Sequence, residues 1–286
     1  MNKAIEDEPW RQRYRGMRVL EVLRVARVTP MMQRVTLGGA EIRDIPEGPN
    51  LKLVIPPRGT TPVWPMRGVD GKPLMPPGHP MPITRTYSLR RLDRAAGEMD
   101  VDFVMHGPGI ASTWAERAQP GDKIGIGGPG GPEVRPADWY LLAGDHTALP
   151  AISRILEKLP PDAQGCAFVA VPDRREEQDL VRPPGITLTW VHADAALGLE
   201  GAVRAVPWPS GKKIYAWLAA ESSAVRSMRS YVRDERGLGR GEFLAIGYWR
   251  RGMSEPEYHE KLDHDRGEDF YDAIRDELQQ SREHAR

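Results

Sequence analysis

The chain has 286 residues, enough for two domains of about 150 residues each. Its 40 basic residues balance 40 acidic ones, so it lacks the basic excess of nucleic-acid-binding proteins, and we expect no nucleic-acid partner. No stretch approaches the roughly 18 apolar residues of a membrane-spanning helix, and the acidic start of the chain has no apolar signal segment. We therefore expect a cytoplasmic protein with no membrane partner. We also expect a monomer.

The first half of the chain has the pattern of short strands separated by turns. β-Branched residues alternate with polar ones from Met17 to Leu37, which predicts two strands interrupted at Thr29 and Pro30. Further strands are predicted at residues 51–56, 85–92, 99–106 and 123–129, with a Pro/Gly-rich loop at 57–82 and a short helix at 112–118. This spacing favours a small antiparallel β-barrel, which we place in residues 1–135.

The pattern changes after Pro136, where strands alternate with helical segments. Strands are predicted at 139–145, 166–171, 185–193, 213–220 and 243–249. Helices are predicted at 146–159, capped by Thr147 and ended by Pro160, and at 222–237. Such alternation indicates a doubly wound α/β domain with a parallel sheet, which we place in residues 136–256. We expect the charged tail, residues 257–286, to be helical in its second half.

The one cysteine, Cys166, stands beside the apolar run AFVAV and is expected to be a buried strand residue. It can form no disulfide within the chain, and an iron–sulfur cluster needs several thiolates. The sequence therefore excludes such a cluster on this chain.

Two segments of the predicted barrel carry groups that suit a flavin dinucleotide, namely RTYS at 85–88 and DFVMHGPGIASTW at 102–114. A pyrophosphate needs a planar fork of donors, which Arg85 supplies, and backbone N–H groups at a helix start, which residues 109–112 can supply. A flavin ring needs an aromatic surface and a donor near its reactive nitrogen, as Tyr87 and Ser88 can provide. The alternative for RTYS is an ordinary half-buried strand, because Thr and Tyr favour strands. The alternative for His106 is a structural role.

Three glycines in the first domain imitate a dinucleotide fingerprint. Gly125, Gly127 and Gly130 match GxGxxG, but GPEVRP follows and cannot form the helix that the fingerprint requires. We interpret these glycines as the crossing from the barrel to the parallel sheet.

The stronger nucleotide candidate is the turn from Gly144 to Ala148, where the first strand of the α/β domain meets its first helix. Arg174 and Arg175, after the next strand, could bind the 2′-phosphate of NADPH. A plain helix start and a solvated charge run explain the same residues, so the arginines favour NADPH only slightly, and NADPH and NADH both remain open as donors.

His259, Glu260 and His264 do not form a metal site by pattern. A zinc protease motif needs histidines four residues apart on one helical face, whereas a spacing of five turns the second histidine away from the first. We expect no metal site.

The ordered motifs RTYS, DFVMHGPGIASTWAERAQPGDKIGIGGPGG, YLLAGDHTALPAI, IYAWLAAESSAVRSMRSYVRDERG and GYWRRG resemble those of the siderophore-interacting proteins, the flavin-dependent ferric-siderophore reductases. The resemblance runs from about Met17 to Glu257. It implies an FAD-binding barrel, a nicotinamide-nucleotide domain, bound FAD, NADPH or NADH as donor, and a ferric siderophore or other ferric chelate as acceptor.

The residue patterns and the resemblance together assign a set of site residues. Cofactor binding is expected at Arg85, Thr86, Tyr87, Ser88, Asp102, Val104, His106, Gly109, Ala111, Ser112, Asp145, Thr147, Ala148, Arg174, Arg175, Glu221, Tyr248 and Trp249. Tyr87 and Ser88 are expected to lie nearest the electron transfer, and Lys52, Arg250 and Arg251 are the candidate cations for the chelate. Each of these cations also fits a solvated surface charge.

Three residues depart from the family pattern, namely Gly130 where a basic residue is common, His146 in place of a glutamate and His192 in place of an arginine. The first argues against a highly anionic substrate, and the other two leave the nucleotide preference open. Two other functions also remain open. One is a general NAD(P)H:flavin diaphorase feeding a ferredoxin-type or haem carrier, and the other is a flavoprotein that binds a siderophore without reducing it.

Overall fold

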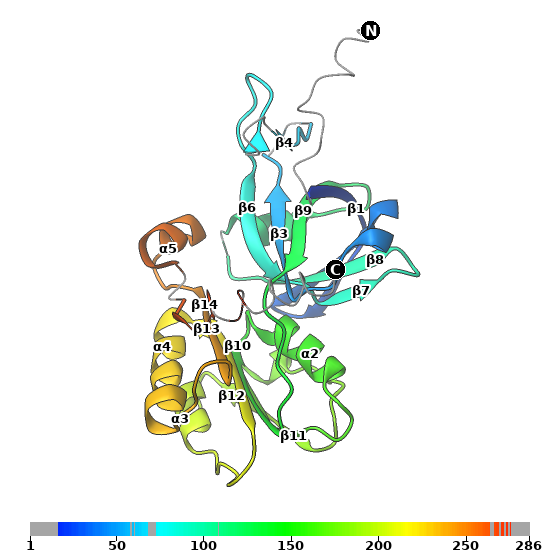
Figure 1. Ribbon diagram of the computed structural model, residues 1–286. Helices are drawn as coiled ribbons and strands as arrows, with labels where there is room; N and C mark the ends of the chain where they lie inside the picture. The colour runs from blue at the N-terminus through cyan, green and yellow to red at the C-terminus, as the bar shows by residue number, and fades with distance from the viewer. Residues whose placement is uncertain are drawn as a thin grey trace, which may run out of the picture. The chain divides into compact units, whose positions relative to one another are not determined.

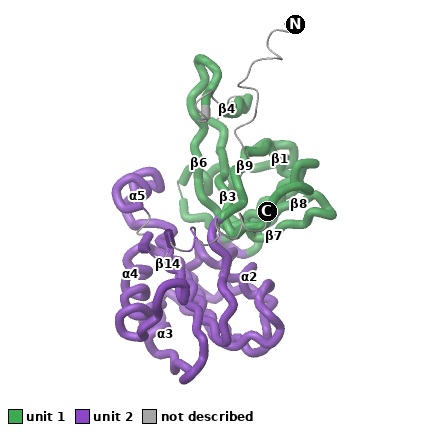
Figure 2. Tube along the Cα trace, viewed as in Figure 1, with its two compact units in different colours: residues 1–28, 32–130 green, residues 29–31, 131–286 purple. Residues whose placement is uncertain are grey.

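The computed structural model describes residues 17–57, 59, 61–67, 73–107, 109–263, 266–268, 270, 271, 273 and 275 (Figure 1). The chain divides into two compact units, shown in Figure 2. Unit 1 comprises residues 1–28 and 32–130, and unit 2 comprises residues 29–31 and 131–286.

Unit 1 contains a seven-stranded sheet in the order β6-β3-β9-β1-β2-β8-β7. The strands are β1 (Met17–Thr29), β2 (Met32–Gly38), β3 (Asn50–Ile55), β6 (Ile83–Ser88), β7 (Arg91–Asp93), β8 (Glu98–Val104) and β9 (Lys123–Gly130). Pairings of β1 with β9, β2 with β8, and β3 with β6 and β9 are antiparallel, as expected for a barrel of this kind. The interruption predicted at residues 29 and 30 is confirmed, since β1 ends at Thr29 and β2 begins at Met32.

Smaller elements complete unit 1. They are the 3-10 helix η3 (Ala40–Asp44), the strands β4 (Met66–Arg67) and β5 (Pro73–Leu74), and the helix α1 (Ile110–Arg117). The pair β4 and β5 lies within the segment that the sequence pattern predicts to be only a loop. Helix α1 forms at the predicted place, where Gly109 provides an extended N-cap.

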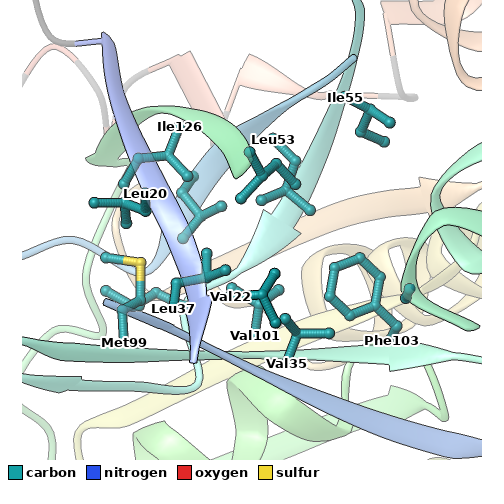
Figure 3. Packing of buried hydrophobic residues seen from close by; sticks show 14 of the residues in the cluster. Leu20, Val22, Val35, Leu37, Leu53, Ile55, Met99, Val101, Phe103 and Ile126 are labelled. Atoms are coloured by element: carbon teal, nitrogen blue, oxygen red, sulfur yellow. The ribbon is translucent and has the colours of Figure 1, made fainter. Parts of the chain in front are cut away.

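The core of unit 1 follows directly from the alternation of its strands, because side chains two residues apart lie on the same face of a sheet. Figure 3 shows the buried set, which includes Leu20, Val22, Val35, Leu37, Leu53, Ile55, Met99, Val101, Phe103 and Ile126. Each fully buried side chain of this size contributes about 1.5 to 3 kcal/mol relative to exposure. The sheet also curls, since the ring of Tyr87 on β6 lies 4.6 Å from that of Phe103 on β8, although β6 and β7 remain the two edges in the described pairings.

The glycines of the false fingerprint lie inside strand β9. Gly125 pairs with Val54 of β3, and a Cβ at Gly125 would lie 2.9 Å from the Cβ of Val54 and 3.2 Å from the ring of Trp64. Gly127 likewise pairs with β1 and β3. The packing around Gly125 supports the rejection of a phosphate role. The interpretation as a crossing between domains is wrong for Gly125 and Gly127, which are interior residues of the first sheet, but Gly130 ends both β9 and unit 1, and the chain enters unit 2 at Gly131.

Unit 2 contains a five-stranded parallel sheet in the order β12-β11-β10-β13-β14 (Figure 1). Its strands are β10 (Trp139–Asp145), β11 (Gln164–Val171), β12 (Ile186–His192), β13 (Ile214–Glu221) and β14 (Phe243–Trp249). Its helices are α2 (Leu149–Lys158), η4 (Arg174–Glu176), α3 (Gly198–Arg204), α4 (Ser222–Ser230), the π-helix η5 (Tyr231–Glu235) and α5 (Glu255–Leu262). The strand order reverses beside β10, which is the switch point where open α/β sheets bind ligands.

The predicted cap of α2 needs correction, and the structure contains two helices that the sequence pattern does not predict. Thr147 does not cap α2, because Ala148 occupies the N-cap and the Thr147 hydroxyl instead donates to Asp145. Helix α3 was not predicted, since its glycines are poor helix formers, but burial of Val203 stabilises it. The first half of the tail forms α5, which Ser254 and Glu257 begin with a capping box. The helix predicted for the second half of the tail lies mostly outside the described residues.

Cys166 is a buried, free thiol on β11, as expected, and burial raises its pKa to about 12. None of the described helices is long and apolar enough to span a membrane.

Candidate functional site

The RTYS strand is β6, and its side chains differ in exposure. Arg85 is half-buried and its Nη1 donates to the carbonyl of Thr84 at 2.9 Å. Thr86 is exposed and accepts a hydrogen bond from Nζ of Lys52, its register partner on β3. Tyr87 packs against Phe103 with an interplanar angle of 40°, and Ser88 is buried. The candidate substrate cation Lys52 therefore lies directly beside the predicted flavin strand.

Strand β8 contributes a buried ion pair at its carboxyl end. Asp102 is 4% exposed, and its two carboxylate oxygens accept from Nε and Nη2 of Arg34 at 2.7 and 2.8 Å. The hydrogen bonds that Arg34 donates to Asp102 raise the pKa of Arg34 above its ordinary value despite partial burial. The side chain of Asp102 thus joins β8 to β2. Val104 is half-buried and His106 is exposed.

The turn into α1 depends on a glycine. A Cβ at Gly109 would lie 2.7 Å from Cε1 of His106 and 2.7 Å from Oγ of Ser112, so a side chain there would displace both. Ser112 is buried, and its hydroxyl lies within hydrogen-bonding distance of the carbonyls of Gly107 at 3.0 Å and Gly109 at 3.1 Å. Ala111 is also buried. Among the described residues no side chain caps the first turn of α1, so its N–H groups suit an anion.

The turn between β10 and α2 is equally tight. A Cβ at Gly144 would lie 2.5 Å from the Cβ of Ala148 and 2.7 Å from the carbonyl oxygen of Ala219. The next residue, Asp145, accepts hydrogen bonds at Oδ1 from the backbone N–H of Thr147 at 2.9 Å and from its hydroxyl at 2.5 Å. Helix α2 therefore begins close against the sheet, at the carboxyl end of the central strand.

Asp145 also joins the ends of three strands. Its Oδ2 accepts from the backbone N–H of Glu221, at the end of β13, at 2.8 Å and from Nε1 of Trp249, at the end of β14, at 2.7 Å. Three of the predicted site residues, which are widely separated in sequence, thus form one hydrogen-bonded cluster. Tyr248, the neighbour of Trp249, stands edge-on to Trp217 at 6.3 Å. These hydrogen bonds fix the ends of β10, β13 and β14 relative to one another at the switch point, where such sheets bind ligands.

Glu221 is the second organising acid at this edge. Its Oε2 accepts from the N–H of Ser223 at 2.6 Å, and its Oε1 accepts from the N–H of Arg251 at 3.2 Å. Burial acts to raise the pKa of Glu221, but the Ser223 hydroxyl, the N–H groups of Arg251 and Ser223 and the charge of Arg250 outweigh it, so the pKa lies below its ordinary value. Arg250 donates to Oγ of Ser222 at 3.2 Å, whereas Arg251 is exposed. Unit 2 therefore holds two of the three candidate substrate cations, and unit 1 holds Lys52.

The two histidines that depart from the family pattern, His146 and His192, each lie beside a glutamate, Glu176 and Glu177 respectively. Nε2 of buried His146 lies 3.2 Å from Glu176, an ion contact whose angle does not satisfy a hydrogen bond. Burial lowers the pKa of His146 more than Glu176 and Asp145 raise it. Glu176, 1% exposed, also accepts from the hydroxyl of Thr29 and from the N–H of Met31 at 2.9 Å. The sequence reasoning missed Glu176, because nothing in the charged run DRREEQD distinguishes it.

The remaining site candidates lie after β11 and in the tail. Arg174 and Arg175 belong to η4 and are exposed. His259 lies 3.5 Å from Asp263, and His264 lies outside the described residues. Within the described part of the chain, no group of three His, Cys, Asp or Glu side chains could hold a metal ion.

The comparisons with known proteins agree with this arrangement. A model described as the siderophore-interacting FAD-binding domain matches residues 21–133, and one described as siderophore-interacting protein matches residues 137–252. Ferric vibriobactin reductase ViuB from Vibrio cholerae is 36% identical over 255 residues, which cover 85% of this chain and 93% of that protein.

Two solved structures are similar along most of their length. The siderophore-interacting protein SipS from Aeromonas hydrophila is 35% identical with a TM-score of 0.75, over 86% of this chain and 96% of SipS. A siderophore utilization protein from T. fusca is 40% identical with a TM-score of 0.74, over 83% of this chain and 94% of that one. The fold predicted from the sequence is confirmed, and the chain belongs to the siderophore-interacting protein family.

Proposed function

We propose that this protein is a cytoplasmic, monomeric ferric-siderophore reductase that takes electrons from NADPH or NADH, passes them through FAD to siderophore-bound Fe(III), and releases Fe(II). The observation that carries the proposal is the likeness to ferric vibriobactin reductase, which extends over 93% of that protein and includes both predicted domains. We assign residues 1–135 to FAD, 136–256 to the nicotinamide nucleotide and 257–286 to a tail. A ferredoxin-type carrier is an alternative electron donor.

The residues of unit 1 fit FAD. The guanidinium of Arg85 and the uncapped first turn of α1, which includes Ala111 and Ser112, would bind the pyrophosphate. Tyr87, held at a fixed tilt by Phe103, offers an aromatic surface, and buried Ser88 offers a hydroxyl. The strand ends around Thr86, Asp102, Val104 and His106 would line the cofactor, with Asp102 acting through its backbone. Gly109 allows the chain to turn close to the phosphates.

FAD supplies the change from paired to single electrons, because nicotinamides give hydride whereas Fe(III) accepts one electron at a time. The protein contributes orientation: Tyr87 and Ser88 would fix the ring, and water would be excluded where Ser88 is buried. No protein nucleophile is required for this reaction. We therefore assign the nearest contacts of the electron transfer to Tyr87 and Ser88.

The residues of unit 2 fit a nicotinamide nucleotide. The tight turn at Asp145, Thr147 and Ala148 lies where the first helix of a doubly wound sheet receives phosphate. Glu221, Tyr248 and Trp249 would flank the nicotinamide end, since they stand at the adjoining strand ends and Asp145 fixes two of them. Arg174 and Arg175 would lie near the adenosine ribose, at the end of the second strand.

The acceptor would be held by cations. Lys52, Arg250 and Arg251 are the candidates, and their charge would attract a chelate whose oxygen donors outweigh the charge of Fe(III). Reduction weakens the hold of such donors on the metal, because Fe(II) is a weaker Lewis acid than Fe(III). The protein would therefore release iron without degrading the siderophore.

An anaerobic titration of the FAD-loaded protein tests the proposal. We expect NADPH or NADH to bleach the yellow flavin absorbance, and a ferric siderophore then to restore it while an Fe(II)-specific dye develops colour. Bleaching by neither nucleotide would refute direct nicotinamide reduction. Reoxidation by a protein carrier but by no ferric chelate would refute the siderophore assignment and favour a diaphorase.

A further inference from the structure

The end of β11 carries an acid directly before the two candidate phosphate-binding arginines. Asp173 precedes Arg174 and Arg175, which begin η4. Strand β11 pairs in parallel with β10, so its carboxyl end borders the nucleotide turn at Asp145. In doubly wound sheets, the group at the end of this second strand contacts the adenosine ribose: an acid accepts from its 2′-hydroxyl, or an arginine binds its 2′-phosphate. This chain has an acid and two arginines at this place, and the contacts of these side chains indicate which form of the ribose they suit.

Asp173 occupies the Nε and Nη2 side of the Arg175 guanidinium, which is one of the two forks that could bind a phosphate. Oδ1 of Asp173 accepts from the backbone N–H of Arg175 at 2.8 Å and from its Nε at 3.0 Å, and Oδ2 accepts from Nη2 at 2.8 Å. The fork of Arg175 holds the pKa of Asp173 at about 2, so the carboxylate is ionised near neutral pH. Across the described residues, the structure records no ion pair for the guanidinium of Arg174.

A second acid, Glu177 at the end of η4, lies beside the end of the neighbouring strand β12. His192, the last residue of β12, lies 2.7 Å through Nε2 from Oε1 of Glu177. A nucleotide bound here therefore meets two carboxylates, Asp173 and Glu177, each held by a partner. A 2′-phosphate would bring further negative charge to the same place.

The charge of Asp173 favours a ribose with a free 2′-hydroxyl at this strand end. The side chains of Asp173 and Arg175 are 43% and 76% exposed, and exposed ion pairs contribute little, so a phosphate could take Arg175 from Asp173. The exchange would leave the ionised carboxylate of Asp173 against a phosphate. A 2′-hydroxyl instead donates to Asp173 while Arg175 stays paired.

We infer that Asp173 determines which nicotinamide nucleotide this chain accepts, because its carboxylate favours a ribose with a free 2′-hydroxyl, as in NADH, over the 2′-phosphorylated ribose of NADPH. The inference rests on the proposed function in one respect, namely that a nicotinamide nucleotide binds at this sheet edge. Asp173 is here a specificity-determining residue, and Arg175 becomes a phosphate ligand when that carboxylate is removed.

Calorimetric titration of the FAD-loaded protein with adenosine 2′,5′-bisphosphate and with adenosine 5′-monophosphate tests the inference without catalysis. In the wild type we expect the monophosphate to bind at least as tightly as the bisphosphate. Asp173→Asn keeps an oxygen for the backbone N–H of Arg175 but removes the charge. We expect it to raise the affinity for the bisphosphate relative to the monophosphate by about ten-fold, the effect of roughly one charge-assisted hydrogen bond.

Two further variants control this experiment. Asp179→Asn removes an exposed acid from the same segment and should leave the affinity ratio unchanged. Asp173→Asn combined with Arg175→Ala should lose the gain, because the released guanidinium is then absent. An unchanged ratio in Asp173→Asn, an equal change in Asp179→Asn, or failure of the monophosphate to bind the wild type would overturn the inference.

Stopped-flow reduction of the flavin by NADH and NADPH separates this inference from the proposed function. If the ligand affinities change as expected but neither nucleotide reduces the flavin, the reductase proposal fails and the role of Asp173 stands. If both nucleotides reduce the flavin and the rate ratio is the same in Asp173→Asn, the role of Asp173 fails and the reductase proposal stands.

Discussion

Replacement of Asp145 by asparagine tests whether one carboxylate organises the ligand-binding edge of unit 2. Four donors converge on it: the N–H and hydroxyl of Thr147, the N–H of Glu221 and the indole N–H of Trp249. An asparagine has one oxygen and one NH2 group, so either orientation of the amide directs N–H toward at least one backbone donor. The remaining hydrogen bonds also lose the negative charge of their acceptor.

The expected cost follows from those contacts. A hydrogen bond to a charged group contributes about 1.5 to 3 kcal/mol, and a donor left unsatisfied costs a similar amount. We therefore expect Asp145→Asn to lower the free energy of unfolding by about 2 to 4 kcal/mol, a large part of the stability of an ordinary domain. Urea unfolding should show a lower midpoint with an unchanged slope.

Asp138→Asn is the matched control, because Asp138 directly precedes β10, at the opposite end from Asp145, and accepts a single backbone N–H, that of Lys213, at 2.9 Å. The amide oxygen of asparagine can replace that acceptor, so we expect a loss below about 1 kcal/mol. A double-mutant cycle of Asp145→Asn with Trp249→Phe should give a coupling energy of about 1 kcal/mol or more. Equal losses in the two asparagine variants, together with additive effects in the cycle, would refute the organising role.

Three further predictions concern stability. Arg34→Met leaves the buried carboxylate of Asp102 unpaired and should lower the free energy of unfolding in urea by about 3 kcal/mol. Arg24→Met breaks an exposed pair and should cost less than about 1 kcal/mol. Similar losses in the two variants would contradict the burial of Asp102. Gly125→Ala should destabilise by about 1 to 3 kcal/mol through overpacking, and Gly130→Ala, with no heavy atom within 4 Å of the added Cβ, by much less; the reverse order would refute the packing of β9. Burial lowers the pKa of His146, so the unfolded chain binds more protons and stability should decrease as pH falls below about 6.5. His146→Gln should lessen that decrease, and an identical pH profile would contradict it.

Local patterns predict the parts of the fold that local forces control. The alternation from Met17 to Leu37 predicts β1 and β2, because every second side chain must face the core. The glycine-bearing turn after β10 is likewise visible in the sequence, since Gly144 is required by close packing against Ala148. The order of the family motifs carries the assignment of both domains.

Contacts between distant segments could not be predicted from local patterns. Trp249 bonds to Asp145 over 104 residues, and Glu176 bonds to Thr29 over 147, so only the folded sheets bring these pairs together. Thr147 illustrates competition: its hydroxyl suits a helix cap, but the carboxylate of Asp145 is nearer and captures it. Tertiary burial, not propensity, likewise accounts for α3.

The measurement that most directly tests the central claim is the anaerobic electron balance during turnover. With FAD-loaded protein, a limiting amount of its preferred nicotinamide nucleotide and an excess of ferric siderophore, we predict about two Fe(II) trapped by dye for each nucleotide oxidised, because hydride carries two electrons and each Fe(III) accepts one. Oxidation of the nucleotide without formation of Fe(II), or Fe(II) formation that does not depend on FAD, would contradict the claim that this protein reduces ferric siderophores through a flavin.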